Sequence, residues 1–337
     1  MAKKRKKKPA KRAGKANPSG AGRSQAGRGP GSRVSKMAGA LALLLLLGGL
    51  VTLWVSSPSS DGSAQSSTSQ QRHADTPPPA DYETHPPSDT HEVEDLTPHS
   101  LGVTVPEALR VHVLARHPHA RDAFTQGLLW HGGKLYESTG LEGQSTLREV
   151  DMGSGEVSRY LDLPDDVFAE GLARVGDHLW QITWKNHKAY RYRLSDFQRE
   201  REVRYEGEGW GLCYDGTRLV MSDGSDTLTF RDPNTFEALG RIHVTKLGRP
   251  LTQINELECH DGSVYANVWQ TDEIVRIDPG TGHVTASIDA GHLYPEDDRY
   301  RDHADVLNGI AWLPDAGHFL ITGKLWPQTY EVEFLPR

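Results

Sequence analysis

The last 230 or so residues of this chain contain one supersecondary unit five times. Each unit has a short apolar strand, a turn built on Gly or Asp-Gly, and a second strand rich in Leu, Val, Ile, Tyr and Thr. This pattern is typical of β-hairpins. The equivalent positions lie 44, 40, 45 and 53 residues apart, at Leu128, Leu172, Leu212, Leu257 and Ile310. A third and a fourth strand follow in the first four units. Repeats of about 45 residues with four strands indicate propeller blades. We therefore predict an all-β fold, a five-bladed β-propeller.

The two ends of the repeat region are predicted to close the ring. The fifth unit ends after three strands, at TYEVEF, and residues 109–117 (LRVHVLARH) form an extra strand before the first unit. If these segments pair, the ring has no open edge. The longest step between units contains residues 292–306, which are polar and rich in acids. They are predicted to form a surface loop and no strand.

The N-terminal third differs chemically from the repeats. Residues 1–36 carry 13 of the 38 Lys and Arg residues and no acid, which leaves 25 basic against 45 acidic side chains in the rest. Residues 37–55 are uncharged, and as a helix they would span roughly 28 Å, the thickness of a bilayer core. We expect an uncleaved, single-pass signal anchor in the cytoplasmic (inner) membrane. Because the positive charge precedes it, the remainder should be exported, periplasmic or extracellular. A cleaved signal peptide is the alternative.

The domain organisation follows from these composition changes. Residues 1–36 are a basic cytoplasmic tail, 37–55 the transmembrane helix, 56–106 a disordered linker rich in Ser, Pro and Thr, and 107–337 the propeller. The tail lacks interleaved aromatic residues and adjoins a membrane span, so we expect it to contact anionic lipid and no nucleic acid. Cys213 and Cys259 could form a disulfide in an exported domain or remain buried thiols.

Polar residues begin the predicted inner strands, which converge on the propeller axis. Buried amides and carboxyl groups cost free energy unless they are paired or functional. They could bond to one another, hold water, bind an ion or form a site. The residues of this kind are Gln126, Glu170, Glu208, Asn255, Glu256 and Asn308.

Tryptophans and one lysine lie at the loops around the same axis. Trp210 begins an inner strand, whereas Trp184 and Trp269 end second strands. Lys324 occupies the same point of the last unit as Trp184 and Trp269 in theirs. The remaining mid-unit tryptophans fit the core. These groups together predict a pocket with a carboxyl acid/base, amide donors, a cation and an aromatic wall, suited to a small polar ligand with an apolar stem.

Seven short motifs in this order resemble the plant-type glutaminyl-peptide cyclotransferases and their bacterial relatives. They are FTQGL, FAEGL followed by ITWKN, EGWGL, INELE, NVWQTD, LNGIA and TGKLWP, and the resemblance extends over about residues 109–337. The resemblance implies cyclisation of N-terminal glutamine of peptides or proteins to pyroglutamate with release of ammonia. The substrate is the only partner expected besides the membrane, and the protein should be a monomer.

The resemblance also implies roles for individual residues. It makes Glu170 the catalytic acid/base, or proton shuttle. It assigns substrate binding to Phe124, Gln126, Phe168, Trp184, Trp210, Asn255, Trp269 and Lys324. No cofactor or metal is required for catalysis, although members of the family can carry a structural divalent ion on the axis.

Two other functions fit a propeller with this axis. A metal-dependent hydrolase of the lactonase or phytase kind would need several axial carboxylates or amides around one divalent ion. A non-catalytic propeller would bind a peptide or a cell-wall component. Sensitivity to a chelator separates the first from a cyclotransferase, and retention of all function in Glu170→Gln would indicate the second.

Overall fold

The computed structural model describes residues 103–337, which form twenty-two β-strands and one short α-helix. The predicted basic tail and transmembrane helix, and the linker up to residue 102, lie outside the described residues. Within residues 103–337, no helix has both the length and the apolar character needed to cross a membrane.

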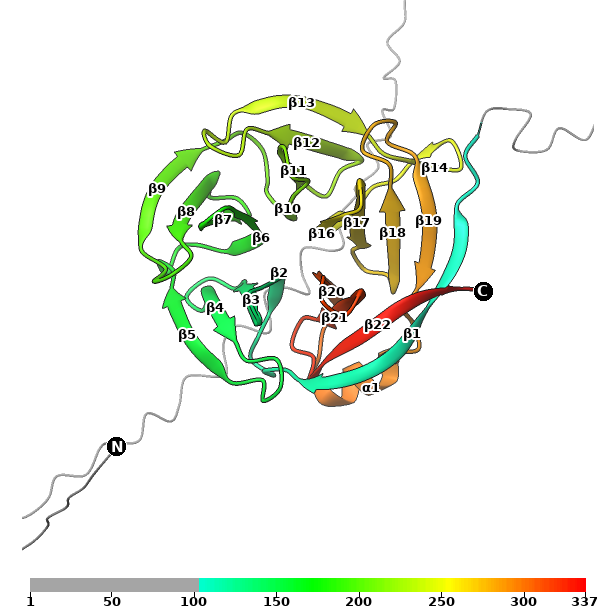
Figure 1. Ribbon diagram of the computed structural model, residues 1–337, viewed down its shortest axis with the longest axis horizontal. Helices are drawn as coiled ribbons and strands as arrows, with labels where there is room; N and C mark the ends of the chain where they lie inside the picture. The colour runs from blue at the N-terminus through cyan, green and yellow to red at the C-terminus, as the bar shows by residue number, and fades with distance from the viewer. Residues whose placement is uncertain (1–102) are drawn as a thin grey trace, which may run out of the picture. The chain divides into compact units, whose positions relative to one another are not determined.

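The strands form four-stranded antiparallel groups arranged as a ring (Figure 1). The first group is β2 (Thr125–His131), β3 (Lys134–Thr139), β4 (Thr146–Val150) and β5 (Val157–Asp162). The second is β6 (Ala169–Val175), β7 (His178–Thr183), β8 (Lys188–Arg193) and β9 (Arg199–Arg204). The third is β10 (Leu212–Tyr214), β11 (Leu219–Ser222), β12 (Thr227–Arg231) and β13 (Ala238–His243). The small hairpin β14 (Thr245–Lys246) and β15 (Arg249–Pro250) follows.

The remaining strands form one eight-stranded sheet that occupies two neighbouring sectors of the ring (Figure 1). One half is β16 (Ile254–His260), β17 (Ser263–Val268), β18 (Glu273–Ile277) and β19 (Val284–Asp289). The other half is β20 (Leu307–Leu313), β21 (His318–Gly323), β22 (Gln328–Pro336) and β1 (Glu107–Pro118). The first strands of the units, β2, β6, β10, β16 and β20, lie nearest the centre, and we call them the inner strands.

Strand β1 closes the ring. It pairs antiparallel with the C-terminal strand β22, for example Val111 with Phe334, and a short parallel pairing joins it to β19. The prediction that residues 109–117 supply the strand missing from the last unit is confirmed. Both edges of β1 are therefore hydrogen-bonded for part of its length, which removes an exposed edge.

The apolar core lies between neighbouring groups of strands. Leu147 of the first group packs with Leu172 and Tyr190 of the second, and Trp180 of the second packs with Leu219 of the third. These side chains are almost fully buried. Because apolar contacts fill the spaces between sheets, the ends of the inner strands are left to carry polar groups.

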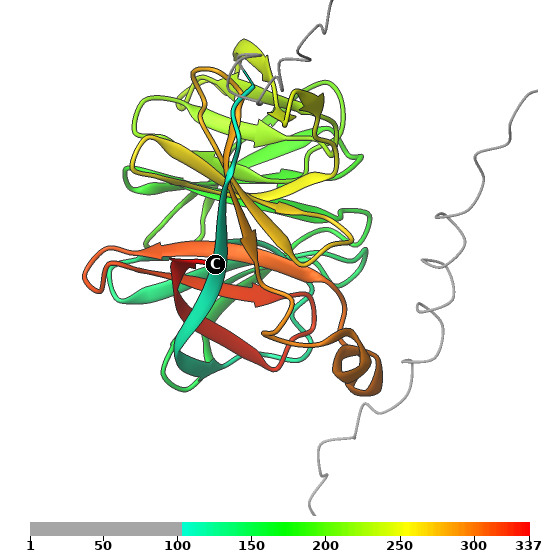
Figure 2. The same ribbon diagram turned by 90° about the vertical axis from the view of Figure 1, so that its right-hand side faces the viewer.

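The prediction of a loop over residues 292–306 was wrong in one respect, because this segment contains the helix α1 (Glu296–Asp302). Figure 2 shows α1 at one side of the ring. Three acidic residues occupy its first turn, where their negative charges interact favourably with the positive end of the helix dipole. Arg299 is buried and donates two hydrogen bonds to Asp272, of 2.8 and 3.0 Å. A seven-residue helix is too short to give a periodic sequence signal.

A disulfide joins the inner strands β10 and β16. It links Cys213 to Cys259, whose Cα atoms are 5.4 Å apart. The sequence had left a disulfide and two buried thiols open, and the structure decides for the disulfide. The bond connects two neighbouring units close to the axis.

Candidate active site

Irregular pairing at the start of the inner strands gives the site its polar groups. The register between first and second strands shifts at Thr125/Gly127, Ala169/Leu172, Ile254/Leu257 and Leu307/Ile310. A β-bulge takes a residue out of the ladder and redirects its side chain. The residues inside these shifts include Gln126, Glu170, Asn255 and Asn308. The same irregularity in four units thus presents a different polar side chain from each.

Glu170 lies at the end of a chain of side-chain amides. Gln126 Nε2 donates to Glu170 Oε1 at 3.1 Å, and Asn308 Nδ2 donates to Gln126 Oε1 at 3.1 Å. Asn308 also donates to the Thr125 carbonyl oxygen at 2.9 Å. Because Asn308 occupies the oxygen of the Gln126 amide, the amide nitrogen faces Glu170. All three side chains are buried.

The charges around Glu170 act in opposite directions on its proton. Burial raises the pKa of Glu170 well above its ordinary value, Lys324 lowers it and Glu208 raises it further. Burial lowers the pKa of Lys324, while Glu170 and Asp305 raise it. A buried carboxyl group with a raised pKa can both accept and return a proton near neutral pH.

Lys324 and two tryptophans occupy equivalent places in their units, as predicted. Each follows a second strand, and its backbone N–H bonds to the chain just before the inner strand. The bonds are Trp184 N to Phe168 O at 3.0 Å, Trp269 N to Gln253 O at 2.8 Å and Lys324 N to Val306 O at 3.0 Å. Antiparallel pairing therefore places these three residues at the end of the ring where the inner strands begin.

Aromatic rings form two groups beside the polar residues. Phe168 contacts Phe124 edge-on at 6.1 Å between centroids and Trp184 at 5.6 Å. Trp210 contacts Trp269 edge-on at 5.5 Å. The Lys324 ammonium lies 4.8 Å from the centre of the Phe124 ring. Phe124 is buried and the other four rings are half-buried. The half-buried rings therefore present part of their surface to solvent beside the buried polar residues.

Glu208 links the two aromatic groups, a role that the sequence prediction missed. Its Oε2 accepts the indole N–H of Trp184 at 2.7 Å and that of Trp210 at 3.1 Å. Lys185 lies 3.5 Å from the other oxygen and 3.9 Å from the centre of the Trp184 ring. Glu208 was one of the polar residues noted at the axis and lies two residues before Trp210, but the sequence did not indicate that it would bond to both indoles.

Asn255 differs from the other predicted residues in its contacts. Its side chain is buried, and its Oδ1 has no hydrogen-bond partner among residues 103–337. Its backbone oxygen accepts a hydrogen bond from Ser222 Oγ at 2.6 Å. The other predicted residues contact one another in three groups, Gln126 with Glu170, Lys324 with the Phe124, Phe168 and Trp184 rings, and Trp210 with Trp269. The Asn255 amide belongs to none of these groups.

The axial carboxylates accept hydrogen bonds from protein groups. Both oxygens of Glu256 accept backbone N–H groups, and Glu170 Oε1 accepts the Gln126 amide. In the described part of the chain, no cluster of three or more His, Cys, Asp or Glu side chains has an arrangement that could hold a metal. We assign no metal ligand.

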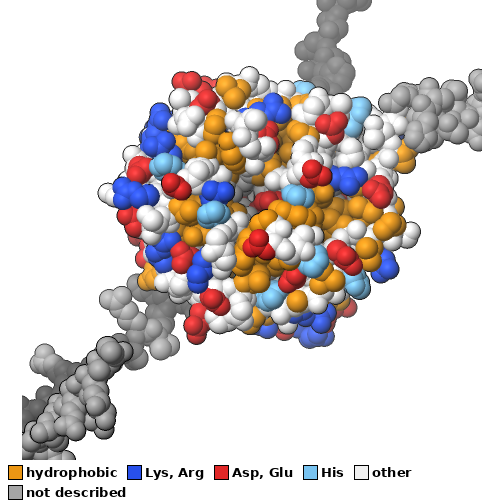
Figure 3. Space-filling model, in the orientation of Figure 1, with side chains coloured by type: hydrophobic (Ala, Val, Ile, Leu, Met, Phe, Trp, Pro, Cys, Tyr) orange, Lys and Arg blue, Asp and Glu red, His pale blue; other side chains and the backbone are white. Residues whose placement is uncertain are grey.

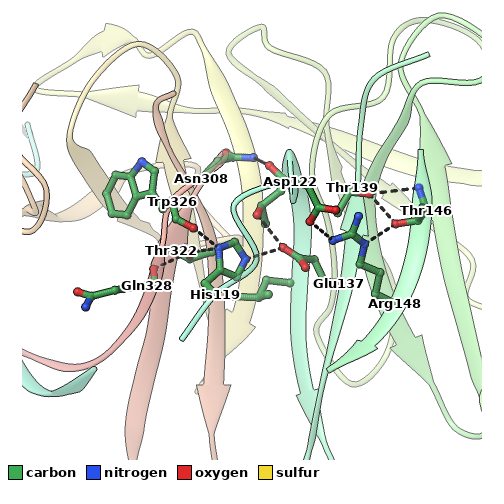
Figure 4. Close-up of polar contacts among 12 residues, drawn as sticks. His119, Asp122, Glu137, Thr139, Thr146, Arg148, Asn308, Thr322, Trp326 and Gln328 are labelled. Carbon is green, nitrogen blue, oxygen red and sulfur yellow. Dashed lines mark hydrogen bonds and ion pairs between the residues drawn. The ribbon is translucent and has the colours of Figure 1, made fainter. Parts of the chain in front are cut away.

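A buried ion pair lies next to the predicted site (Figure 4). His119 Nδ1 is 2.7 Å from the Trp326 carbonyl oxygen, and its Nε2 is 2.9 Å from Glu137 Oε1. A carbonyl oxygen only accepts, so Nδ1 must carry a proton. Thr125 also donates to Glu137 Oε1, at 2.7 Å. This pair connects the end of β1 with Thr125, the neighbour of Gln126, and with the loop that carries Lys324.

The face of the ring in Figure 3 is hollowed at its centre. Positive, negative and apolar side chains are interspersed on it. This face carries no extended patch of a single charge.

Comparisons with known proteins agree with one another. The family model described as glutamine cyclotransferase matches residues 90–334. A glutaminyl-peptide cyclotransferase of Arabidopsis thaliana is 39% identical over 235 residues, which are 66% of this chain and 71% of the relative. The crystal structure of Myxococcus xanthus glutaminyl cyclase is similar with a TM-score of 0.64 and 41% identity, over 69% of this chain and 99% of that one.

Proposed function

The chain belongs to the glutamine cyclotransferase family, and from this premise we propose that Glu170 moves the proton in its reaction. The protein is a glutaminyl-peptide cyclotransferase, an acyltransferase that converts N-terminal glutamine of peptides to pyroglutamate with release of ammonia. The observation that carries the role of Glu170 is its burial beside one amide donor and one cation, with a raised pKa.

The reaction requires one proton to move between two nitrogen atoms. The α-amine of the substrate attacks the γ-carboxamide carbon, a C–N bond forms, and the bond to the amide nitrogen breaks. A free α-amine has a pKa of about 7.7–8.0, so a neutral fraction is present at neutral pH. In our proposal, Glu170 takes the proton from the attacking amine and delivers it to the departing ammonia. The carboxylate is restored at the end of the cycle.

The remaining residues of the site bind and orient the substrate in this proposal. Lys324, Gln126 and Asn255 are the donors available to a developing oxyanion, and a well-aimed donor contributes about 10²-fold or more. The Asn255 Oδ1, an acceptor, has no partner among residues 103–337, so this amide is available to a ligand. The rings of Phe124, Phe168, Trp184, Trp210 and Trp269 would fold the glutamine side chain back toward its amine.

Ammonia release from a glutaminyl dipeptide amide is the test of this function. We expect the purified protein to release ammonia and to form the pyroglutamyl product equally well in the presence of EDTA, because the proposed groups need no metal. Loss of activity in EDTA and recovery with calcium or zinc would favour a metal-dependent hydrolase. A folded protein that leaves the peptide unchanged would contradict the proposal.

We propose further that the ring is a five-bladed β-propeller. The five equivalent inner strands and the two halves of the eight-stranded sheet support this count. A crystal structure with a different number of four-stranded sectors would overturn it.

We also propose that residues 37–55 anchor the protein in the inner membrane and that the enzyme works outside the cytoplasm. The Cys213–Cys259 disulfide supports export, because such bonds persist in oxidising compartments. The full-length protein should remain in the membrane fraction after a carbonate wash, whereas a variant lacking residues 37–55 should be soluble. Recovery of the full-length protein in the soluble fraction would count against the anchor.

A further inference from the structure

One inner strand departs from a rule that the other four obey. Each unit has a polar or aromatic residue two positions before its equivalent Leu or Ile (Leu128, Leu172, Leu212, Leu257 or Ile310). The residue between these two positions is glycine in four of the five units. These glycines are Gly127, Gly171, Gly211 and Gly309. In the fourth unit the same position is Glu256.

The glycines allow the inner strands to approach closely around the axis. A Cβ atom on Gly127 would overlap the backbone of Leu172, and one on Gly171 would overlap that of Leu212. A Cβ on Gly211 would overlap the Asn255 carbonyl oxygen. A glutamate at this position therefore needs a reason that the repeat itself does not supply.

The Glu256 side chain joins two other inner strands. Its Oε1 accepts the backbone N–H of Leu128 in β2 at 3.1 Å, and its Oε2 accepts that of Ile310 in β20 at 2.8 Å. The side chain is only 1% exposed. Each oxygen of a carboxyl group can accept one of two converging N–H donors, whereas an amide would direct its own N–H₂ at one of them. Burial and Glu258 raise the pKa of Glu256 well above its ordinary value, and the two N–H donors oppose that effect only in part.

The two strands held by Glu256 also carry the amides that lead to Glu170. Leu128 lies two residues after Gln126, and Ile310 lies two residues after Asn308. Asn308 donates to Gln126, and Gln126 donates to Glu170. A small displacement of β2 relative to β20 would change the direction in which the Gln126 amide points.

We propose that Glu256 is a positioning residue for the reaction, which holds β2 and β20 in the register in which Gln126 donates to Glu170. The inference rests on the proposed role of Glu170. Glu256 acts through the two strands and does not touch the substrate.

The test compares Glu256→Gln with the matched control Glu258→Gln. Glu258 carries a carboxyl group on the same strand, and within residues 103–337 its Oε1 accepts only the Trp312 N–H, at 3.3 Å. We expect Glu256→Gln to lower kcat at least about tenfold with KM changed less than about threefold, since misplaced catalytic groups slow the chemical step. Glu258→Gln should retain the kcat of the wild type.

The pH dependence separates positioning from a merely structural role. If the Gln126 amide no longer donates to the Glu170 carboxylate, the pKa of Glu170 should rise. The acid limb of the kcat/KM profile should therefore move to higher pH in Glu256→Gln. A carbon-13 NMR titration of the Glu170 carboxyl group should show the same shift without any need for turnover. A Glu256→Asp variant keeps the carboxyl group but shortens the side chain that reaches the Leu128 and Ile310 N–H groups, and it should reproduce the shift if Glu256→Gln does not fold.

The outcomes distinguish this proposal from the proposed function. An unshifted Glu170 titration in Glu256→Gln, or in Glu256→Asp if that variant must be used, would overturn the positioning role. Equal losses in Glu256→Gln and Glu258→Gln would also overturn it. If the wild type releases no ammonia, the proposed function fails, and the NMR titration still decides whether Glu256 controls the environment of Glu170.

Discussion

Glu170→Gln should lower kcat for a glutaminyl dipeptide amide by about 10²–10⁴-fold, the contribution of a positioned acid/base. Glutamine has nearly the same size and keeps an oxygen for the Gln126 amide, so the site should remain folded. It cannot accept a proton from the attacking amine. We therefore expect KM to change far less than kcat, measured by steady-state ammonia release together with a thermal unfolding curve.

Glu208→Gln is the matched control, because this carboxylate belongs to the same site without a proposed proton transfer. It should alter KM more than kcat, since it holds the indoles of Trp184 and Trp210. Its negative charge also raises the pKa of Glu170. Removing it should move the acid limb of the kcat/KM profile to lower pH. Glu170→Gln with more than half of the normal kcat would rule out the proposed proton shuttle.

Breaking the buried pair of His119 and Glu137 should have the largest effect on stability. Removal of one partner of a buried ion pair typically costs about 3–5 kcal/mol, because the other charge is left uncompensated. For a domain of this size we expect His119→Leu or Glu137→Gln to lower the melting temperature by on the order of 10 °C. The double variant His119→Leu/Glu137→Leu should recover part of the loss. Asp196→Asn, which breaks the exposed pair with Arg193, should leave the melting curve nearly unchanged.

The pair also predicts a stability optimum between two pH limits. Burial lowers the pKa of His119, but the Glu137 carboxylate and the Trp326 carbonyl raise it above its ordinary value of 6.5. Its contribution is complete below 6.5 and is lost as the pH rises through the folded value. Burial raises the pKa of Glu137, whereas His119 and Arg148 bring it below 4.5. That contribution is complete above 4.5 and is lost on acidification. A melting temperature that varies with pH identically in wild type and His119→Leu would contradict this account.

The arrangement of strands was accessible from the sequence because its signals are local. Alternation of side chains and Gly-containing turns specify each hairpin within about 15 residues, and repetition then implies a ring. The strand at residues 109–117 could be assigned because the last unit lacked one. The helix α1 could not be, because its burial depends on a contact between Arg299 and Asp272, residues of different parts of the chain.

The candidate site shows the same division. The motifs selected Glu170, Gln126 and Lys324, and the equivalence of Lys324 with Trp184 followed from alignment of the repeats. The amide chain from Asn308 to Glu170 and the pairing of two indoles with Glu208 could not be read from any motif. Apart from Trp210 with Glu208, these contacts join residues 24 to 182 positions apart in the chain.

The repeated strands, their order and the residues at the axis could be predicted from the amino-acid sequence, because the spacing of apolar residues and the chemistry of turns are properties of short segments. The contacts among those residues became known from the folded ring. It paired Cys213 with Cys259, turned the Gln126 amide toward Glu170, and placed Glu256 between the backbones of two other units. Closure of the ring sets these distances, and the strength of a hydrogen bond depends on distance and angle whatever the separation along the chain.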